Sequence, residues 1–371
     1  MNKKVFIYTL FSIILGLIVG SIILILNGAN PINAYKVIFL GVFSNPKYIS
    51  WTIVNSIPII LTGISVAFAF NTGLFNIGAE GQYIVGSIGA FLIGYLLKLP
   101  PIIHGLFALF MGAIFGGIWG GIVGFFKAKF KVNEVISSIM MNWIAFYFSN
   151  LLLNFSVFRR TSSDTTFSIQ PTANIEFLKD FKTTEAGMEF FKHHTMLKEF
   201  FKPPINWGLF VAIIVAILIW YVLNRTTLGY QLKAVGFNKY AAEYGGININ
   251  KNQVISMTIA GAISGLAGAI MVLGVNGNLI LLASQEGYGF NGMAVSLIGL
   301  NNPILCIPAG FLFSGLNYGG GKLNAALNIP SEVIKVVIGT IIFFIAMPKL
   351  FDLFANYFKH IFSRNKEGSN E

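Results

Sequence analysis

Cysteine, charge and histidine are all scarce in this chain of 371 residues. The single cysteine, Cys306, excludes an intramolecular disulfide framework and lies in an apolar stretch, where we expect a small buried side chain. Charged residues make up 11% of the sequence, against roughly 25% in soluble domains. Because 55% of the residues are hydrophobic, the composition excludes an ordinary soluble enzyme and indicates a protein of the lipid bilayer.

Patterns that carry enzyme chemistry are also missing. The sequence has no H-E-x-x-H, G-x-S-x-G or C-x-x-C motif. The segment Gly319–Lys322 (GGGK) resembles a phosphate loop, but Leu323 replaces the Ser/Thr and Leu316 stands where the first glycine belongs. Adjacent His193 and His194 are more typical of solvated side chains than of a metal site. We therefore expect neither a catalytic residue nor a metal site on this chain.

Ten apolar runs suggest transmembrane helices, each of which needs about 20 residues. The runs cover 5–26, 49–70, 81–97, 102–126, 135–155, 205–223, 253–274, 288–300, 303–320 and 331–347. The first run follows Lys3 and Lys4 as a signal peptide would, but it exceeds the about 7–15 residues of a signal core, so we expect a retained helix. The sequence predicts an all-α integral membrane protein with about ten transmembrane helices in a compact bundle.

Basic residues outnumber acidic ones, 25 to 14, and their positions predict the orientation. No basic run is interleaved with aromatics as in a nucleic-acid site, whereas basic residues of membrane proteins gather on cytoplasmic loops. A cytoplasmic N-terminus puts thirteen basic residues inside and four outside: Lys3, Lys4, Lys127, Lys129, Lys131, Arg225, Lys233, Lys239, Lys251, Lys349, Lys359, Arg364 and Lys366 against Lys36, Lys47, Lys98 and Lys322. Both termini are then cytoplasmic, with a transmembrane domain over 1–348 and a cytoplasmic tail over 349–371.

One long polar insert, about 156–204, then falls outside the cell. Its basic and acidic residues are mixed, and long segments translocate largely regardless of charge. The insert also carries phenylalanines that predict short helices packed on the outer face: Phe177, Phe181, Phe190, Phe191, Phe200 and Phe201.

The stretch GLFNIGAEGQ, residues 73–82, interrupts the apolar pattern with three glycines, Asn76, Glu80 and Gln82. Irregular backbone at membrane depth is tolerated only where it is enclosed by protein or lines a cavity, and a carboxylate there indicates a functional site. The alternative is that Glu80 is interfacial or pairs with a neighbour and locks the bundle. Glu134, preceded by Asn133, is instead typical of a helix start.

Small residues and a weak internal similarity add to this picture. Glycines at four-residue spacing, in 112–124, and the small residues of 261–269 predict close helix packing. The stretch LFNIGAEGQYIVGSIGAF resembles GFNGMAVSLIGLNNPILC, and paired interrupted segments in two halves point to a transport site. Over so few residues, repeat ancestry and chance both remain open.

A second polar stretch, within 225–250, is too polar to insert into the membrane and is cytoplasmic by the charge count. Leu232, Val235, Tyr240 and Tyr244 can line one side of a short helix pair broken at Gly236. Small exposed residues, Ala241 and Ala242, then suit insertion into a groove of another protein. The alternative is an ordinary amphipathic loop.

Four stretches together resemble the permease subunits of ATP-binding-cassette (ABC) importers. They are GLFNIGAEGQ (73–82), NEVISSIMMNWIA (133–145), TTLGYQLKAVGFNKYAAEYGGI (226–247) and GFNGMAVSLIGLNNPILCIPAGFLFSGL (289–316). The similarity is to the ribose/branched-chain amino acid permease superfamily, in its nucleoside and simple-sugar branch. It runs in order from about residue 50 to 347, but the insert matches nothing in that family.

The resemblance implies a ten-helix bundle with interrupted helices in the bacterial inner (plasma) membrane. This bundle would pair with a second permease subunit, which would be either a paralogue or a second copy of the chain. ATP and Mg would bind to separate cytoplasmic ATPase subunits, and an extracellular solute-binding lipoprotein would deliver the solute. The chain itself would need no cofactor. The coupling segment that contacts the ATPase would comprise Leu228, Gly229, Ala234, Gly236, Ala241, Ala242 and Gly245.

The expected function is alternating-access import of nucleosides or related simple sugars. We expect the solute path at Phe75, Asn76, Glu80 and Gln82, with Phe290 and Asn291 as counterparts in the second half. The main alternative is a stand-alone secondary transporter of a small polar solute, coupled to an ion gradient with Glu80 as proton carrier. An intramembrane enzyme lacks any convergent set of catalytic groups.

Overall fold

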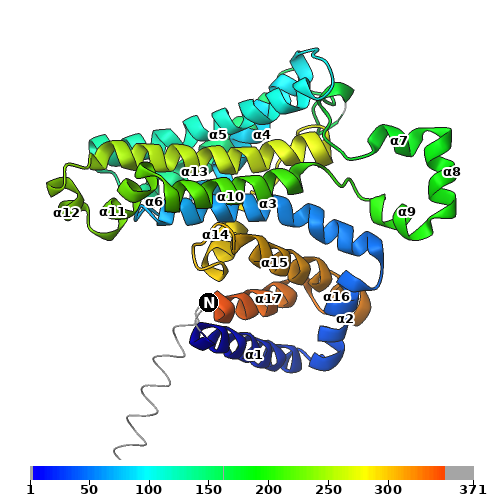
Figure 1. The fold of residues 1–371 in the computed structure, drawn as a ribbon. Helices are drawn as coiled ribbons and strands as arrows, with labels where there is room; N and C mark the ends of the chain where they lie inside the picture. Colours follow the sequence, from blue (N-terminus) through cyan, green and yellow to red (C-terminus); the bar gives the residue numbers. More distant parts are fainter. Residues whose placement is uncertain (1–2, 162, 347–371) are drawn as a thin grey trace, which may run out of the picture. The chain divides into compact units, whose positions relative to one another are not determined.

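The computed structural model describes residues 3–161 and 163–346, which form helices and, beyond them, only three isolated β-bridges. The tail expected at 349–371 lies outside the described residues. Each of the ten apolar runs contains a helix (Figure 1): α1 (Lys3–Leu26), α3 (Pro46–Phe70), α4 (Ala79–Leu96), α5 (Ile103–Phe130), α6 (Glu134–Leu152), α10 (Gly208–Arg225), α13 (Ile249–Met271), α14 (Tyr288–Ile298), α15 (Cys306–Gly320) and α17 (Ser331–Ala346).

Fewer than ten of these helices meet the requirements for a membrane crossing. Among the described residues, α3, α5, α6, α10 and α13 with its continuation to Asn276 are long and apolar enough. A sixth is counted if the bent pair of Ser12–Leu26 in α1 and α2 (Pro31–Phe43), which is bent by 115°, forms one span. The 11 residues of α14 extend about 16 Å at 1.5 Å per residue, well short of the ~30 Å hydrocarbon core. A helix is therefore present in each expected run, and five or six of the described helices meet the length and composition of a span, so the number of ten spans stays a prediction.

Short elements complete the chain. They are η1 (Pro171–Ala173), α7 (Lys179–Thr183), α8 (Glu185–His193), α9 (Thr195–Phe201), α11 (Thr227–Phe237), α12 (Lys239–Tyr244), the π-helix η2 (Val272–Asn276) and α16 (Lys322–Leu327). Helices α7–α9 confirm the short helices expected within the insert, and α11 and α12 form the expected helix pair. Helix α2, which bends sharply away from α1, was not expected from the sequence.

The chain divides into two compact units, Phe43–Ser314 and Met1–Val42 with Gly315–Glu371. In the smaller unit, α1 packs on α17, and a side chain on Gly16 would approach Ile341 Cα to 3.1 Å. The Tyr35 hydroxyl of α2 donates a hydrogen bond to the Leu17 carbonyl at 2.7 Å. A glycine and an interhelical hydrogen bond thus let these helices approach closely, as expected in lipid.

The larger unit is built around α13, which packs against α3, α4 and α5. The glycine ridge of α5 faces α13: a side chain on Gly116 would overlap Gly265, and one on Gly124 would come within 3.0 Å of Val254 Cα. Gly86 of α4 is in backbone contact with the same Gly265, and Gly112 of α5 lies against Gly86, so α4, α5 and α13 meet at this point. The predicted small-residue packing is therefore confirmed, and it leaves no room for a side chain at these crossings.

Candidate functional site

The interruption between α3 and α4 is the centre of the candidate site. Helix α3 ends at Phe70, and residues 71–78 form turns before α4 begins at Ala79. Gly73 has φ +73°, a backbone conformation that favours glycine. A Cβ atom on Gly73 would lie 3.3 Å from the Gly236 Cα of α11. We call residues 71–78 the α3–α4 connection; its backbone rests directly on α11.

Two amides hold the connection to the first turn of α4. Asn76 Nδ2 donates to Gln82 Oε1 at 2.8 Å, and Gln82 Nε2 donates back to Asn76 Oδ1 at 2.9 Å. Asn76 also donates to Ser65 Oγ at 3.0 Å, and that hydroxyl donates to the Ala260 carbonyl at 2.6 Å. Because both amides are fully buried, this reciprocal pair satisfies polar groups that would otherwise be costly.

A third amide comes from α6. Asn142 Oδ1 accepts from the Gly81 amide at 2.8 Å, and Asn142 Nδ2 donates to the Ile77 carbonyl at 3.0 Å. These bonds satisfy backbone groups that the interrupted helix leaves unpaired. The sequence analysis missed Asn142 as a site residue, although an asparagine within an apolar run was a visible signal.

Glu80 joins the start of α4 to the start of α14. Its Oε1 accepts from the Gly287 amide at 2.7 Å, and its Oε2 accepts from the Gly289 amide at 2.6 Å. A side chain on Gly289 would overlap the Glu80 backbone, so the two segments touch without intervening atoms. Thr62 of α3 adds a hydrogen bond from its hydroxyl to the Tyr288 carbonyl at 2.9 Å. The two stretches with internal similarity therefore meet, linked by a carboxylate.

The expected path residues differ in exposure. Asn76, Glu80 and Gln82 are fully buried and hydrogen-bonded within the protein, Phe75 and Asn291 are half-buried, and Phe290 is exposed. The Phe75 ring packs edge-on against Phe70, with centroids 6.2 Å apart. In this conformation the polar groups of Asn76, Glu80 and Gln82 all bond within the protein and brace the start of α4.

Further polar side chains line a small cavity beside the same helix start. The cavity has a volume of about 30 Å³, room for roughly one water, and Tyr83, Ser149, Asn276 and Glu286 contribute polar groups to it. The rings of Tyr83 and Tyr288 lie 5.2 Å apart. Asn276 ends the π-helix η2, and such helices are frequent at functional sites. Glu286 escaped the sequence analysis although it directly precedes the GYGFNG stretch.

The coupling segment is anchored on the α3–α4 connection. Gly236 packs so tightly against Asn71 and Gly73 that no side chain fits there. Two other residues of α11, Leu232 and Val235, are buried. Helix α11 is thus in direct contact with the backbone that carries Asn76.

Three details of this segment differ from the sequence-based expectation. The break between α11 and α12 lies at Asn238, two residues after the expected Gly236. The Asn238 side chain caps α12, because its Oδ1 accepts hydrogen bonds from the Tyr240 and Ala241 amides at 3.0 and 3.1 Å. Ala242 is buried, whereas Ala241 is exposed. Tyr240 and Tyr244 do not line a packed side with Leu232 and Val235; they are exposed, Tyr244 by 98%.

The remaining expected coupling residues also differ in exposure. Gly245 is exposed, Leu228 and Ala234 are half-buried, and Gly229 is packed under α10. Beside α12 lies a groove of about 790 Å³, lined by Lys127, Lys131, Lys239, Tyr240 and Glu243 among others. One of its lysines is already paired, since Lys127 Nζ lies 2.7 Å from Glu134 Oε2. This end of the unit therefore presents exposed aromatic rings beside a basic groove.

Comparison with known proteins agrees with this architecture. Residues 48–346 match the family described as branched-chain amino acid transport system / permease component. The chain is 38% identical over 337 residues to the guanosine ABC transporter permease protein NupP of Bacillus subtilis, covering 91% of this chain and 92% of the relative. It is 34% identical to the nucleoside ABC transporter permease protein NupB of Lactococcus lactis, covering 91% and 90%.

A more distant relative is the glucose ABC transporter permease protein TsgB13 of Haloferax volcanii, 26% identical over 92% of this chain and 87% of the relative. No solved structure shows a significant match. The stand-alone, ion-coupled alternative has no support among these relatives. The chain belongs to the branched-chain amino acid transport system permease family and is a permease subunit of an ABC transporter in the bacterial inner (plasma) membrane.

Proposed function

We propose that this permease subunit translocates nucleosides in an ABC importer. The observation that carries the proposal is the 38% identity over 91% of the chain to a permease named for guanosine, together with the 34% identity to one named for nucleosides. Sugar import has weaker support, since the relative named for glucose is 26% identical. Purine nucleosides offer a stacking face and several donors and acceptors, which suit a path with Phe75, Phe290 and polar groups.

The proposed solute path runs where α4 and α14 begin. Phe290 and Asn291 would lie on the second-half side of this path. Glu80 would become available when its bonds to Gly287 and Gly289 open, and Asn76 and Gln82 when their reciprocal bonds open. The cavity beside Tyr83 and Glu286 adjoins this region. Support for the path is the concentration of buried polar groups at an interrupted helix, which is uncommon in a membrane bundle.

Transport energy would come from other chains. ATP and Mg would be bound by cytoplasmic ATPase subunits that dock on the coupling segment, and the chain itself carries no expected catalytic role. The exposed rings of Tyr240 and Tyr244 beside a basic groove support a protein contact at α12, because aromatic residues are enriched at interfaces. A second permease subunit, a paralogue or a second copy, and an extracellular solute-binding lipoprotein would complete the importer.

The proposed topology has ten spans and cytoplasmic termini. Its support is the charge at the end of the larger unit that carries α11 and α12, where seven basic residues face two acidic ones: Lys127, Lys129, Lys131, Arg225, Lys233, Lys239 and Lys251 against Glu134 and Glu243. By the positive-inside rule this end is cytoplasmic. Helices α7–α9 lie at the opposite end of the unit (Figure 1), on the outer side of the membrane.

The decisive experiment is solute uptake by cells with and without the chain, in the presence of its partner subunits. We expect ATP-dependent uptake of guanosine to be lost on deletion and restored by the wild-type chain, while ribose and guanine uptake stay unchanged. Loss of ribose or guanine uptake alone would contradict the nucleoside assignment. Uptake that continues after ATP depletion would contradict the role in an ABC importer.

A further inference from the structure

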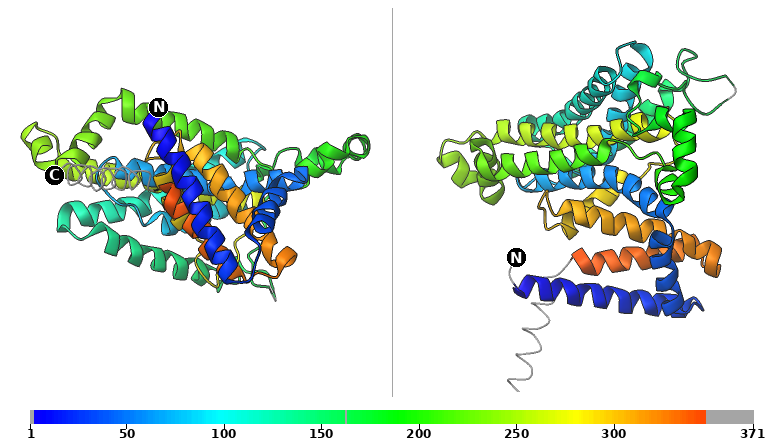
Figure 2. Two further views of the ribbon diagram at one scale, coloured as in Figure 1. Left: turned by 90° about the horizontal axis from the view of Figure 1, so that it is seen from below. Right: turned by 45° about the vertical axis from the view of Figure 1, so that its right-hand side comes forward.

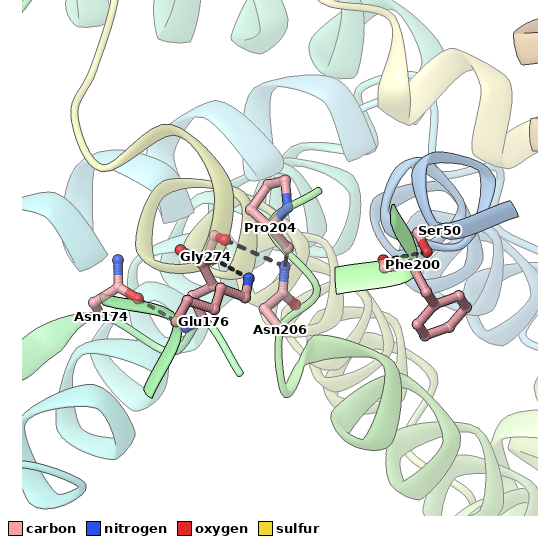
Figure 3. Close-up of polar contacts among 8 residues, drawn as sticks. Ser50, Asn174, Glu176, Phe200, Pro204, Asn206 and Gly274 are labelled. Carbon is pink, nitrogen blue, oxygen red and sulfur yellow. Dashed lines mark hydrogen bonds and ion pairs between the residues drawn. The ribbon is translucent and has the colours of Figure 1, made fainter. Parts of the chain in front are cut away.

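The insert is firmly attached to the outer end of the larger unit. Its first part pairs with the segment after η2: the Thr166 amide donates to the Leu279 carbonyl and the Ile169 amide to the Gly277 carbonyl, at 2.9 and 2.8 Å. Its last part is held by Asn206, whose Nδ2 donates to Pro204 at 3.2 Å and reaches the Gly274 carbonyl at 3.5 Å (Figure 3). Hydrogen bonds therefore hold both ends of the insert to the bundle, and we call the insert the platform.

Helices α7–α9 form a small aromatic cluster at the tip of this platform. The ring centroids of Phe181 and Phe191 lie 6.1 Å apart, and those of Phe191 and Phe201 lie 6.2 Å apart. Helix α9 is tied to α3 by a hydrogen bond from Ser50 Oγ to the Phe200 carbonyl at 2.5 Å (Figure 3). The three helices project beyond the bundle helices of their unit in Figure 1 and in the left view of Figure 2.

A groove of about 680 Å³ opens on this tip. Its lining combines apolar and basic side chains: Met188, Phe191 and Phe201 with Lys182, Lys192, Lys198 and Lys202, and Glu176 is the one acidic residue of this lining. Glu176 is already paired with Lys182 at 2.8 Å, and Lys202 lies 3.9 Å from Glu199. Within the described residues, no ion pair involves Lys192 or Lys198. The groove, defined by these eight lining residues, therefore carries uncompensated positive charge.

We propose that this groove docks the solute-binding protein of the importer, through a surface of that protein with carboxylates around an apolar tip. The proposal rests on the proposed function and adds the place and the chemistry of the contact. Four lysines against one glutamate favour an acidic partner, and electrostatic complementarity accelerates association and selects the partner. The apolar lining residues Met188, Phe191 and Phe201 offer the partner a place to bury a hydrophobic side chain.

A soluble protein fits this surface better than the lipid bilayer does. Helices α7–α9 extend past the ends of α4, α5 and α13 (Figure 1). The apolar residues line a concave groove, whereas a helix that binds lipid presents a continuous convex apolar face. Met196, which is 80% exposed, extends the apolar area outside the groove and enlarges the surface for a protein partner.

The insert also connects this groove to the bundle. Its stem contacts residues 277–281, and Asn278, Leu279 and Ile280 of that segment line the cavity beside Tyr83. Docking at the tip would thus act on a wall of the proposed solute region through direct hydrogen bonds. The partner would deliver its solute at the same end of the unit.

Charge reversal tests the proposal in cells that carry the complete importer. We expect Lys192→Glu with Lys198→Glu to lower guanosine uptake at least tenfold at low external guanosine, where delivery is limiting, with the same amount of chain in the membrane. Lys179→Glu makes the same type of change on α7 outside the groove and should stay within twofold of wild type. Equal uptake by the double variant and Lys179→Glu would overturn the docking site.

Photo-crosslinking identifies the occupant. A benzoylphenylalanine in place of Met188 should form an adduct with the extracellular guanosine-binding protein, and the double lysine variant should lose most of it. Adducts with lipid alone would overturn the proposal. If the wild-type chain fails to import guanosine at all, the nucleoside assignment fails; if it imports guanosine and the double variant does too, only the docking site fails.

Discussion

The Glu80 carboxylate accepts a hydrogen bond from the Gly289 amide at 2.6 Å, although the two residues are 209 positions apart in the chain. With the second bond from Gly287, this carboxylate is the direct polar link between the start of α4 and the start of α14. A buried carboxylate that accepts two backbone hydrogen bonds stabilises the contact of these helices. Any opening of a path between α4 and α14 has to break both bonds.

Replacement of Glu80 separates its bracing role from proton transport. Gln offers one acceptor oxygen, so Glu80→Gln should keep one of the two backbone bonds and retain substantial uptake. Leu offers none, and each unsatisfied buried donor costs about 1–3 kcal/mol, so Glu80→Leu should lower the thermal unfolding midpoint and the uptake further. Glu189→Gln, on the exposed face of α8, is the matched control. Equal damage in both Glu80 variants, or uptake driven by a pH gradient without ATP, would contradict this role.

The reciprocal bonds between Asn76 and Gln82 predict a strong coupling between the two residues. In Asn76→Leu or Gln82→Met, the remaining buried amide loses its partner at a cost of about 1–3 kcal/mol. The double variant removes both amides together and should be less destabilised than the sum of the two single variants. Thermal unfolding of the purified chain in detergent measures this double-mutant cycle. Strictly additive effects would show that the two amides do not act as a pair.

The sequence predicted the helices better than the site. Apolar runs identify helices because a helix satisfies its own backbone hydrogen bonds in lipid. The small residues of 112–124 and 261–269 predicted close packing, but not that α5 and α13 pack against each other. The role of Glu80 was partly predictable, since the alternative of a bracing carboxylate was open, but its partners 207 and 209 residues away were not. Exposure of Ala242 was predicted wrongly because a six-residue helix has no periodicity from which its buried side can be determined.

The contact of Gly86 with Gly265 predicts that α4 tolerates no side chain at this crossing. A methyl group on Gly86 would overlap the backbone of α13, and overpacking of this kind typically costs 1–3 kcal/mol. We expect Gly86→Ala to lower the unfolding midpoint and the yield of folded chain. Gly339→Ala is the control, because nothing lies within 4 Å of the added methyl group and alanine favours the helix. A Gly86→Ala chain as stable as Gly339→Ala would show that α4 can shift away from α13.

Docking of the ATPase on α12 is tested at Ala241, because Ala242 is buried and its replacement would disturb the fold. Ala241→Arg places a long charged side chain next to the exposed Tyr240 and Tyr244, where a partner groove would close around a small residue. We expect co-purification with the ATPase and stimulated ATP hydrolysis to fall at least tenfold, while membrane insertion is unchanged. Ala186→Arg makes the same change at an exposed alanine of α8, at the opposite end of the unit, and should leave the ATPase bound. Retention of the ATPase by the Ala241→Arg chain would place the contact elsewhere on the cytoplasmic end.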